Sequence, residues 1–299
     1  MQLDLDNQTR FRLQRALLLV NQRARRGSRP IDGARAVFSA HGFELVEPQN
    51  PGLTLADQVR AVGGIDLVIV GGGDGSLNAV APALIERRLS LGILPLGTAN
   101  DLARTLSLPL DPAAAARVIT AGHRRRLDLG EVNGHPFFNV ASVGFSADLA
   151  RGLTAEAKRR WGVLGYAIAA LRILSQSRPF TLYIEHDGQV EEVRTIQLSV
   201  GNGRFYGGGM TVEVNAQPDD GRLDVYSLEV PHWWHLIALM PALRRGTHGR
   251  WKHVRAFGTT ALKLTTRRPH DINADGELVS TTPAEFRIIP QAVEVFAPR

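Results

Sequence analysis

The first part of the chain alternates short apolar runs with segments whose apolar residues recur at helical spacing. Apolar runs of strand length lie at residues 15–20, 65–70 and 91–96. Helices are predicted near residues 31–41, 77–89 and 111–121, and Gly122 is placed to end the last of them. Uninterrupted apolar strands separated by helices are typical of a parallel sheet covered on both faces. The pattern therefore predicts a three-layer α/β domain.

After about Leu127 the pattern changes to many short strands separated by Gly, Asp and Pro turns. Such a succession predicts an antiparallel β-sandwich or barrel. One helix is expected to interrupt it, near residues 155–175. We place the boundary at residues 123–128, which gives an N-terminal domain at 12–127 and a C-terminal domain at 128–298.

Composition narrows the function classes. Apolar residues make up 44% of the 299, which permits a large core and excludes general disorder. There is no cysteine, so disulfides, thiolate chemistry and cysteine-ligated zinc are excluded. The net charge of +6 is carried almost wholly by arginine, whose fixed charge suits phosphate. A nucleotide, an anionic membrane, a nucleic acid or a genomic preference for arginine would each account for this excess.

Neither an export signal nor a membrane span is evident. The first 15 residues lack the basic-then-apolar order of a signal peptide. The longest apolar stretch, residues 161–174, is too short to cross a bilayer and contains Arg172. We therefore expect a cytoplasmic protein whose contact with membranes is peripheral.

A glycine-rich loop, GGGDGS at residues 71–76, lies between a predicted strand and a predicted helix. Glycines allow backbone N–H groups to approach an anion, and the helix adds its positive end, with Ser76 as its expected N-cap. The loop lacks the third glycine of the dinucleotide fingerprint and the lysine of a P-loop. An ordinary tight turn is the alternative, but the run of glycines exceeds what a turn needs, so we predict phosphate binding.

A second loop, GTAND at residues 97–101, occupies the same position one strand later. Thr98 offers a hydroxyl to phosphate, and Asn100 or Asp101 could cap the next helix or hold the loop. Alone this segment is equally compatible with simple capping. Two such loops at the carboxyl ends of neighbouring strands would form one crevice, which is where open α/β sheets bind ligands.

Three further turns lie in the β-rich part. The glycine-dense segment 201–210 carries Arg204 as a candidate phosphate ligand. Asp220 lies in a Pro-Asp-Asp-Gly turn, where a carboxylate could supply a hard oxygen to Mg²⁺. Asp275-Gly276-Glu277 is an acidic turn that could supply a general base, although both acidic turns also have ordinary conformational explanations.

Taken together, these pieces resemble the bacterial diacylglycerol kinase-like lipid kinases, which include YegS-like proteins and are related to sphingosine and ceramide kinases. The resemblance extends from Asn21 to about Pro298, and order and spacing both match. Its most specific pieces are GGGDGSLNAV, LPLGTAND, VGNGRFYGGGM, PDDGRLDV and ADGE. The resemblance implies an N-terminal domain like that of NAD kinases and phosphofructokinases, a C-terminal β-sandwich, and an active site between them.

The resemblance also implies roles for individual residues. Glu277 would be the general base with Asp275 as its acidic neighbour, and Asp220 would bind Mg²⁺ beside the carbonyls of Gln217 and Arg222. Asp101 and Arg204 would lie near substrate or phosphate. The residues implied for ATP are Asn21, Gly71, Gly72, Gly73, Asp74, Gly75, Ser76, Asn78, Thr98 and Asn100.

Departures from the family pattern concern mainly the nucleotide side. The first loop, residues 21–28, replaces a rigid proline with arginines, and Glu44 to Pro48 replace a threonine-rich stretch. Ser76 stands where threonine is commoner, which keeps the hydroxyl. Contacts to the adenosine are therefore less well defined than contacts to the phosphates.

Two basic-aromatic segments could meet the lipid. Trp233 and Trp234 precede an apolar run and two arginines, and residues 158–161 read Lys-Arg-Arg-Trp. Tryptophan beside cationic residues suits the bilayer interface, although packing of these rings into the core is equally compatible.

The sequence thus predicts an enzyme that transfers the γ-phosphoryl group of ATP, with Mg²⁺, to a hydroxyl of a membrane lipid. Two alternatives stay open: a kinase for a soluble acceptor such as NAD, and a lipid-binding regulator without catalysis. Nucleic-acid binding is disfavoured because no recognition motif accompanies the charge. An exposed edge strand would permit a homodimer.

Overall fold

The computed structural model describes residues 14–21, 31–152, 172–173, 175–202, 205–206, 210–211, 217–230, 235 and 253–299. Several expectations therefore fall outside the described residues, namely those on Arg204, Trp233, Trp234, the first-loop residues 22–28, the segment 158–161 and most of the helix expected near residues 155–175. Among the helices that are described, none is long and apolar enough to cross a bilayer.

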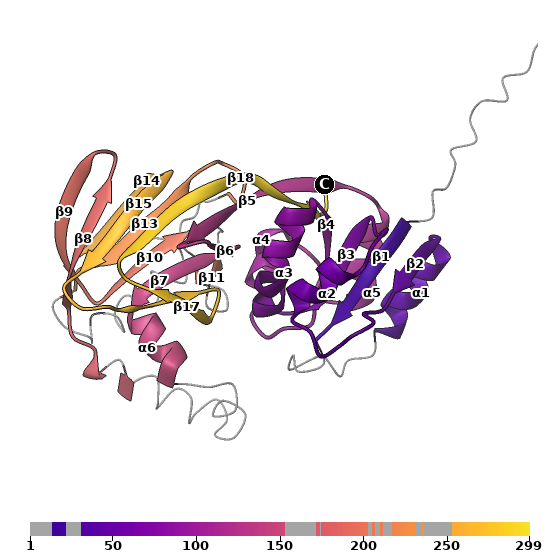
Figure 1. Ribbon diagram of the computed structural model, residues 1–299, viewed down its shortest axis with the longest axis horizontal. Helices are drawn as coiled ribbons and strands as arrows, with labels where there is room; N and C mark the ends of the chain where they lie inside the picture. The colour runs from indigo at the N-terminus through magenta and orange to yellow at the C-terminus, as the bar shows by residue number, and fades with distance from the viewer. Residues whose placement is uncertain are drawn as a thin grey trace, which may run out of the picture.

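The N-terminal half is a parallel sheet covered on both faces, which confirms the three-layer α/β prediction (Figure 1). Its strands, in the spatial order β2-β1-β3-β4, are β1 (Gln14–Val20), β2 (Phe43–Val46), β3 (Leu67–Gly72) and β4 (Ser90–Pro95). The helices are α1 (Asp32–Ala40), α2 (Leu55–Ala61), α3 (Asp74–Arg87), α4 (Asp101–Thr105) and α5 (Pro112–Thr120). Alternate residues of β3 point to opposite faces of the sheet. Val68 packs with residues of α2 and α3 on one face, whereas Ile69 packs with residues of α1 and α5 on the other.

The C-terminal half is an antiparallel sandwich, also as predicted. One layer has the order β14-β13-β10-β7-β16-β17, and β17 forms one of its edges. These strands are β7 (Val140–Gly144), β10 (Gln197–Gly201), β13 (Leu223–Leu228), β14 (Val254–Thr259), β16 (Asp271–Ala274) and β17 (Glu277–Thr281). Val143 and Val200 of this layer are buried in one cluster with Leu182 and Leu264 of the other, which forms the sandwich core.

The other layer is continuous with the N-terminal sheet. After β4 it runs through β18-β15-β8-β9, while β5 pairs with β18 and β6 pairs with β5. These strands are β5 (Arg124–Val132), β6 (His135–Phe137), β8 (Phe180–His186), β9 (Gln189–Thr195), β15 (Ala261–Thr266) and β18 (Ala284–Phe296). Val295 of β18 pairs with Leu91 of β4, so one long strand joins the two halves (Figure 1). The boundary that we drew at residue 127 falls within β5, which lies along β18.

Three small elements complete the described fold. Helix α6 (Phe145–Gly152) follows β7 and contacts β16 and β17. Strands β11 (Phe205–Tyr206) and β12 (Met210–Thr211) form a separate pair.

The prediction that Ser76 caps α3 is wrong. The helix begins at Asp74, and its N-cap is Gly73, whose carbonyl accepts the N–H groups of Ser76 (2.9 Å) and Leu77 (3.2 Å). Glycine can bring its backbone into the crowded strand-to-helix turn, so the helix starts earlier than the apolar pattern indicated. Ser76 consequently lies in the first turn.

Candidate active site

The two glycine-bearing loops lie against each other, backbone to backbone. The carbonyl of Gly72 accepts the N–H groups of Leu96 (2.9 Å) and Gly97 (3.1 Å). A β-carbon on Gly73 would lie 2.9 Å from the α-carbon of Gly97, closer than side chains tolerate. The parallel order of β3 and β4 thus produces the shared crevice expected from the sequence, and glycine is required where the two chains touch.

The N-terminus of α3 opens into this crevice. The N–H groups of Asp74 and Gly75, the first two residues of the helix, have no intrahelical acceptor, and the helix dipole favours an anion there. Asn21, at the end of β1, ties this turn to the sheet: its Nδ2 donates to the Ser76 hydroxyl (2.9 Å) and its N–H to the Gly71 carbonyl (2.9 Å). Gly71 and Gly72 themselves are the last residues of β3. Asn78, one turn into α3, has a buried Oδ1 with no hydrogen-bond partner among the described residues.

The second loop is held by its own polar side chains. Asn100, at a positive φ of 52°, accepts the Gly97 N–H (2.9 Å) and donates to the Gly97 carbonyl (3.1 Å). Asp74 accepts the N–H of Leu102 (3.1 Å), which joins the first turns of α3 and α4. Asp101 is buried at the start of α4, whereas Thr98 is exposed to solvent. Of these residues, Thr98 is the one most open to a ligand.

Asp275 lies in the turn between β16 and β17, where Asp275 and Gly276 both have positive φ. Its carboxylate accepts the N–H groups of Phe138 (2.7 Å), Asn139 (3.0 Å) and Val140 (3.0 Å). Burial raises the pKa of this carboxyl to about 7, against the opposing effect of the three N–H donors. The negative charge of Asp74 raises the pKa further, so the acidic turn lies near the first turn of α3.

Glu277 begins β17 and faces the N-terminal half. Its Oε1 lies 3.3 Å from the point where a β-carbon on Gly75 would stand. The side chain is otherwise exposed, and its charge lies near the positive end of α3. The structure therefore brings the predicted base and the predicted phosphate loop together, although they are about 200 residues apart in the sequence.

Two polar residues of the site were missed in the sequence. Asp128 is buried on β5, where its carboxylate accepts the N–H groups of Gly221 (2.7 Å) and Gln291 (2.7 Å). Asn202 is buried just after β10 and donates to two carbonyls near Asp275. The available signals were an acid flanked by two leucines in β5 and an asparagine inside the glycine-dense segment.

The turn at residues 217–222 offers oxygen ligands suited to a hard cation. Asp128 anchors the turn, since its N–H also donates to the carbonyl of Pro218 (2.7 Å). Arg125 binds both carboxylate oxygens of Asp219 (2.6 Å each), whereas Asp220 is exposed and accepts the N–H of Arg222 (3.0 Å). Within the described residues, no three His, Cys, Asp or Glu side chains are grouped to hold a metal. A cation here would thus combine Asp220 with backbone carbonyls, and these donors fit Mg²⁺.

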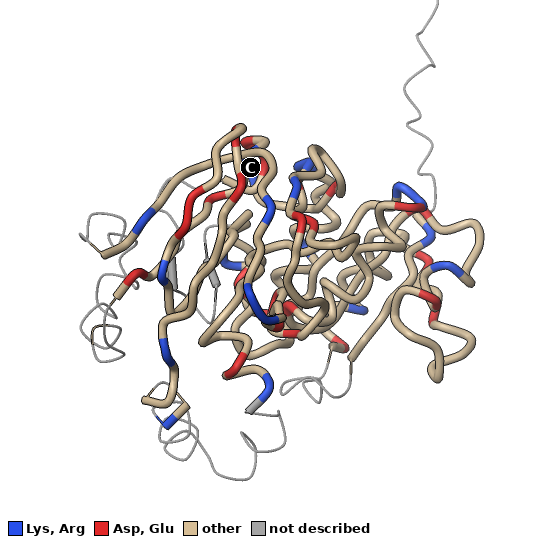
Figure 2. Tube along the Cα trace, turned by 60° about the vertical axis from the view of Figure 1, so that its left-hand side comes forward, with Lys and Arg blue, Asp and Glu red and all other residues tan. Residues whose placement is uncertain are grey.

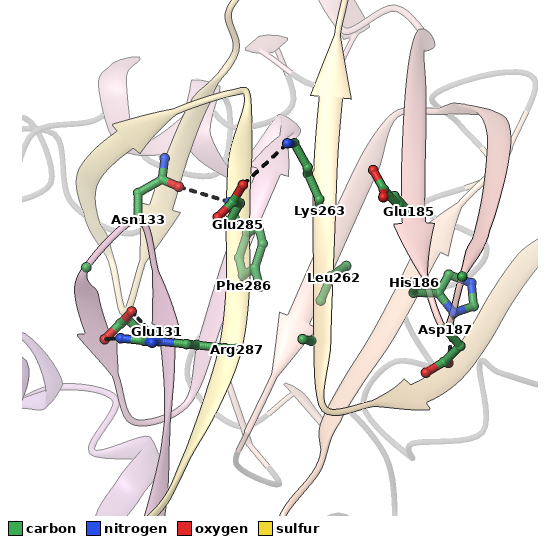
Figure 3. Close-up of a pocket in the computed structure, with 13 residues that line it drawn as sticks. Glu131, Asn133, Glu185, His186, Asp187, Leu262, Lys263, Glu285, Phe286 and Arg287 are labelled. Atoms are coloured by element: carbon green, nitrogen blue, oxygen red, sulfur yellow. Dashed lines mark hydrogen bonds and ion pairs between the residues drawn. The ribbon is translucent and has the colours of Figure 1, made fainter.

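A depression of about 620 Å³ lies elsewhere, on the outer face of the first sheet (Figure 3). It is crossed by ion pairs between Arg287 and Glu131 (2.7 Å) and between Lys263 and Glu285 (3.3 Å). None of the predicted site residues lines it. Because Arg287 and Lys263 are each already paired with a carboxylate of the same depression, we assign it no ligand.

Two protein-family models match the chain. Residues 15–132 match the diacylglycerol kinase catalytic domain, and residues 139–297 match the YegS C-terminal NAD kinase beta sandwich-like domain. The chain is 34% identical over 237 residues to a Pseudomonas aeruginosa protein named "Probable lipid kinase YegS-like", covering 79% of this chain and 78% of that protein. It is 31% identical over 235 residues to a diacylglycerol kinase of Staphylococcus saprophyticus, covering 78% of this chain and 77% of that enzyme.

Solved structures show the same architecture. A crystal structure from Bacillus anthracis, provisionally described as a diacylglycerol kinase, is 25% identical and superposes with a TM-score of 0.83 over 98% of both chains. Another structure from this organism, of a diacylglycerol kinase, is 22% identical and superposes with a TM-score of 0.72 over 96% of this chain and 98% of that one. The second likeness shows the fold alone.

Proposed function

The chain belongs to the diacylglycerol kinase-like family of lipid kinases, and on that premise we propose that it phosphorylates a hydroxyl of a membrane glycerolipid. Family membership makes it an ATP-dependent lipid kinase. The observation that carries the finer proposal is the approach of the Glu277 carboxylate to Gly75. That contact supports a mechanism in which a base from one half acts beside an anion-binding helix terminus from the other.

On the nucleotide side, the N–H groups of Asp74 and Gly75 at the start of α3 bind the triphosphate, and Thr98 contributes its hydroxyl. Asn21, Asp74 and Asn100 hold these two loops in place through the hydrogen bonds described above. Glu277 lies too close to Gly75 for a phosphoryl group to fit directly between them. The exposed Glu277 side chain therefore turns outward when the triphosphate binds, while the Asp275 turn stays in place.

On the acceptor side, Glu277 takes the proton of the lipid alcohol as the alcohol oxygen attacks the γ-phosphorus in line; the bond from that phosphorus to the β,γ-bridging oxygen breaks, and ADP leaves with the electron pair. A base positioned in this way contributes roughly 10²–10⁴-fold to the rate. Asp275 sits beneath it and fixes the turn through three peptide N–H groups. Because phosphoryl transfer has a loose transition state, positioning and charge neutralisation supply most of the catalysis.

Mg²⁺ is the expected cofactor, held at the 217–222 turn by the Asp220 carboxylate with the carbonyls of Gln217 and Arg222. When bound near the nucleotide, Mg²⁺ supplies charge neutralisation at the phosphate oxygens. Hydrogen bonds with Asp128 attach this turn to β5. The oxygen ligands of the turn are therefore held in place without a bound cation.

The lipid approaches along the edge strand β17. Leu278 directly follows Glu277 and is 43% exposed, so an apolar surface lies next to the proposed base. An apolar side chain at this position would contact an acyl chain while the adjacent carboxylate meets the hydroxyl. This supports a peripheral, transient encounter with the membrane. Figure 2 shows basic and acidic positions interspersed over both halves of the described chain, so charge alone does not mark the docking face.

Labelled ATP offered with mixed-lipid vesicles, or with NAD as a soluble acceptor, tests the proposal. We expect the label in the lipid extract, dependent on Mg²⁺. Label transferred only to NAD would contradict a lipid acceptor. Binding to vesicles with no transfer at all would indicate a regulator.

A further inference from the structure

Asn202 is a buried residue at which three backbone segments are tied together. It directly follows β10 and is 2% exposed. Its Nδ2 donates to the carbonyls of Asp128 (2.9 Å) and Phe138 (3.0 Å), and its N–H donates to the carbonyl of Asn139 (2.8 Å). The side chain thus connects β5 with the segment between β6 and β7.

Two of these hydrogen bonds end on the same peptide groups that hold Asp275. The carbonyl of Phe138 and the N–H of Asn139 belong to one planar peptide group, and the carbonyl of Asn139 and the N–H of Val140 belong to the next. Asn202 binds the carbonyl side of each group, while the Asp275 carboxylate accepts from the N–H side (3.0 Å in both cases). Since a peptide group is rigid, fixing its carbonyl also fixes the direction of its N–H.

We propose that Asn202 is a positioning residue for the acidic turn: it aims the peptide N–H groups of Asn139 and Val140 at Asp275 and so holds Glu277 at the start of α3. The inference rests on the proposed function, because it assigns Asn202 a part in presenting the base. Asp128, one of the two residues whose carbonyl the Asn202 side chain binds, is itself held in place, since both of its carboxylate oxygens accept hydrogen bonds. Hydrogen bonds arranged in series also polarise one another, which strengthens the donors that face Asp275.

The chemistry requires an amide at this position. A carboxamide NH₂ has two donors, and here it serves two carbonyl acceptors. An aspartate of the same shape would turn a carboxylate oxygen towards those carbonyls. Its other oxygen would replace Oδ1, which is enclosed and has no partner among the described residues. If Asn202 merely filled space, Asn202→Asp would lower activity less than Asn202→Ala, because aspartate has the same shape. If the amide of Asn202 acts as a donor, Asn202→Asp lowers activity more than Asn202→Ala.

The test measures lipid phosphorylation by Asn202→Ala and Asn202→Asp, alone and combined with Asp275→Asn. We expect kcat to fall by about 10-fold or more for Asn202→Ala and further for Asn202→Asp, with KM for ATP changed by less than about two-fold. When Asp275→Asn is already present, adding Asn202→Ala should lower kcat by less than about a further two-fold. Both changes disrupt the same set of hydrogen bonds, so the second has little left to remove. Additive losses would overturn the inference.

Asn133→Ala is the matched control. Asn133 also ties strands through its amide, donating to the Ser280 hydroxyl (2.8 Å) and accepting the Glu285 N–H (2.9 Å; Figure 3), but these hydrogen bonds do not involve the peptide groups that hold Asp275. It should lower the melting temperature at least as much as Asn202→Ala while leaving kcat within about two-fold. An equal loss of kcat in the control would reduce Asn202 to a general stabilising role.

Hydrogen–deuterium exchange of the 138–140 amides gives a readout independent of activity. The Asn139 amide, whose peptide group is held by the Asn202 side chain through the Phe138 carbonyl, should exchange faster in Asn202→Ala and at the wild-type rate in Asn133→Ala. If the wild type transfers no phosphate to lipid but this exchange difference appears, the proposed function fails and the hydrogen-bond tie stands. If the wild type is active and Asn202→Ala matches it in both kcat and exchange, the inference fails alone.

Discussion

The carboxylate of Glu277 lies against Gly75, with Oε1 3.3 Å from the position of a β-carbon on that glycine. The two residues come from opposite halves of the chain and meet where the first turn of α3 presents free N–H groups. An acidic side chain facing the positive end of a helix is electrostatically favoured, and the same terminus suits a phosphate. Most of the proposed chemistry depends on this proximity.

Replacing Glu277 with glutamine should lower kcat for lipid phosphorylation by roughly 10²–10⁴-fold, because the amide cannot accept the proton. ATP affinity and the melting temperature should stay close to those of the wild type, since the side chain is exposed. Glu285→Gln, an exposed carboxylate on the outer face, is the control and should keep full activity. A fully active Glu277→Gln enzyme would remove the base from the mechanism.

Substituting Gly97 with alanine should separate the two nucleotide loops. Its β-carbon would collide with the backbone of Gly73 and lie 2.6 Å from Oδ1 of Asn100. Overpacking of this kind costs about 1–3 kcal/mol, and we expect KM for ATP to rise by about 10-fold or more. Steady-state kinetics and circular dichroism check the result. Gly63→Ala is the control, because a β-carbon there meets nothing within 4 Å. It should change neither KM for ATP nor the circular dichroism spectrum.

The half-buried Asp275 should give stability an unusual dependence on pH. Its folded-state pKa of about 7 lies above the unfolded value, so its contribution is complete below about pH 4 and is lost as the pH rises towards 7. Asp275→Asn removes that ionisation. The unfolding free energy of the variant minus that of the wild type should therefore increase between pH 4.5 and 8, by at most about 4 kcal/mol.

Urea unfolding at several pH values measures this difference. Comparing the two proteins cancels the carboxylates whose pKa is lowered, such as Glu294, which change stability in the opposite direction. Parallel curves would mean that Asp275 is ionised in the folded protein throughout the range.

Leu278→Ser should raise the apparent KM for vesicle lipid several-fold while leaving KM for ATP unchanged, because the change removes apolar contact beside the base. Val190→Ser is the control: it also replaces an exposed apolar side chain with serine, since Val190 is 67% exposed, but it lies on the distant edge strand β9. Kinetics at varied lipid content measure both variants. Equal effects on the two would argue against an acyl-chain path along β17.

Asp220→Asn should weaken the stabilisation of the protein by Mg²⁺. A cation that binds only the folded state raises the melting temperature, so the wild type should melt higher with Mg²⁺ than without. The rise should shrink in Asp220→Asn and persist in Asp219→Asn, because Asp219 is already bound by Arg125. Identical shifts in all three proteins would place the cation elsewhere.

The sequence by itself determined the order and class of the elements. Apolar runs such as 91–96 and the glycine-rich turn after β3 predicted a parallel sheet with two anion-binding loops, because both signals are local. It did not reveal that β18 joins the halves into one sheet, since strand pairing across 200 residues leaves no periodic trace. It also misplaced the start of α3, where the backbone of Gly73 rather than the Ser76 side chain forms the cap.

Only the tertiary structure decided how the polar residues are used. The sequence supplied Asp275 and Glu277 as adjacent acids. Their different environments, one half-buried on three N–H groups and one exposed against Gly75, arise from segments that meet only in the folded chain. Asp128 and Asn202 carried almost no local signal because their role is to satisfy backbone groups of distant strands. Burial and hydrogen bonding are properties of the assembled structure, whereas periodicity and turn chemistry are written in neighbouring residues.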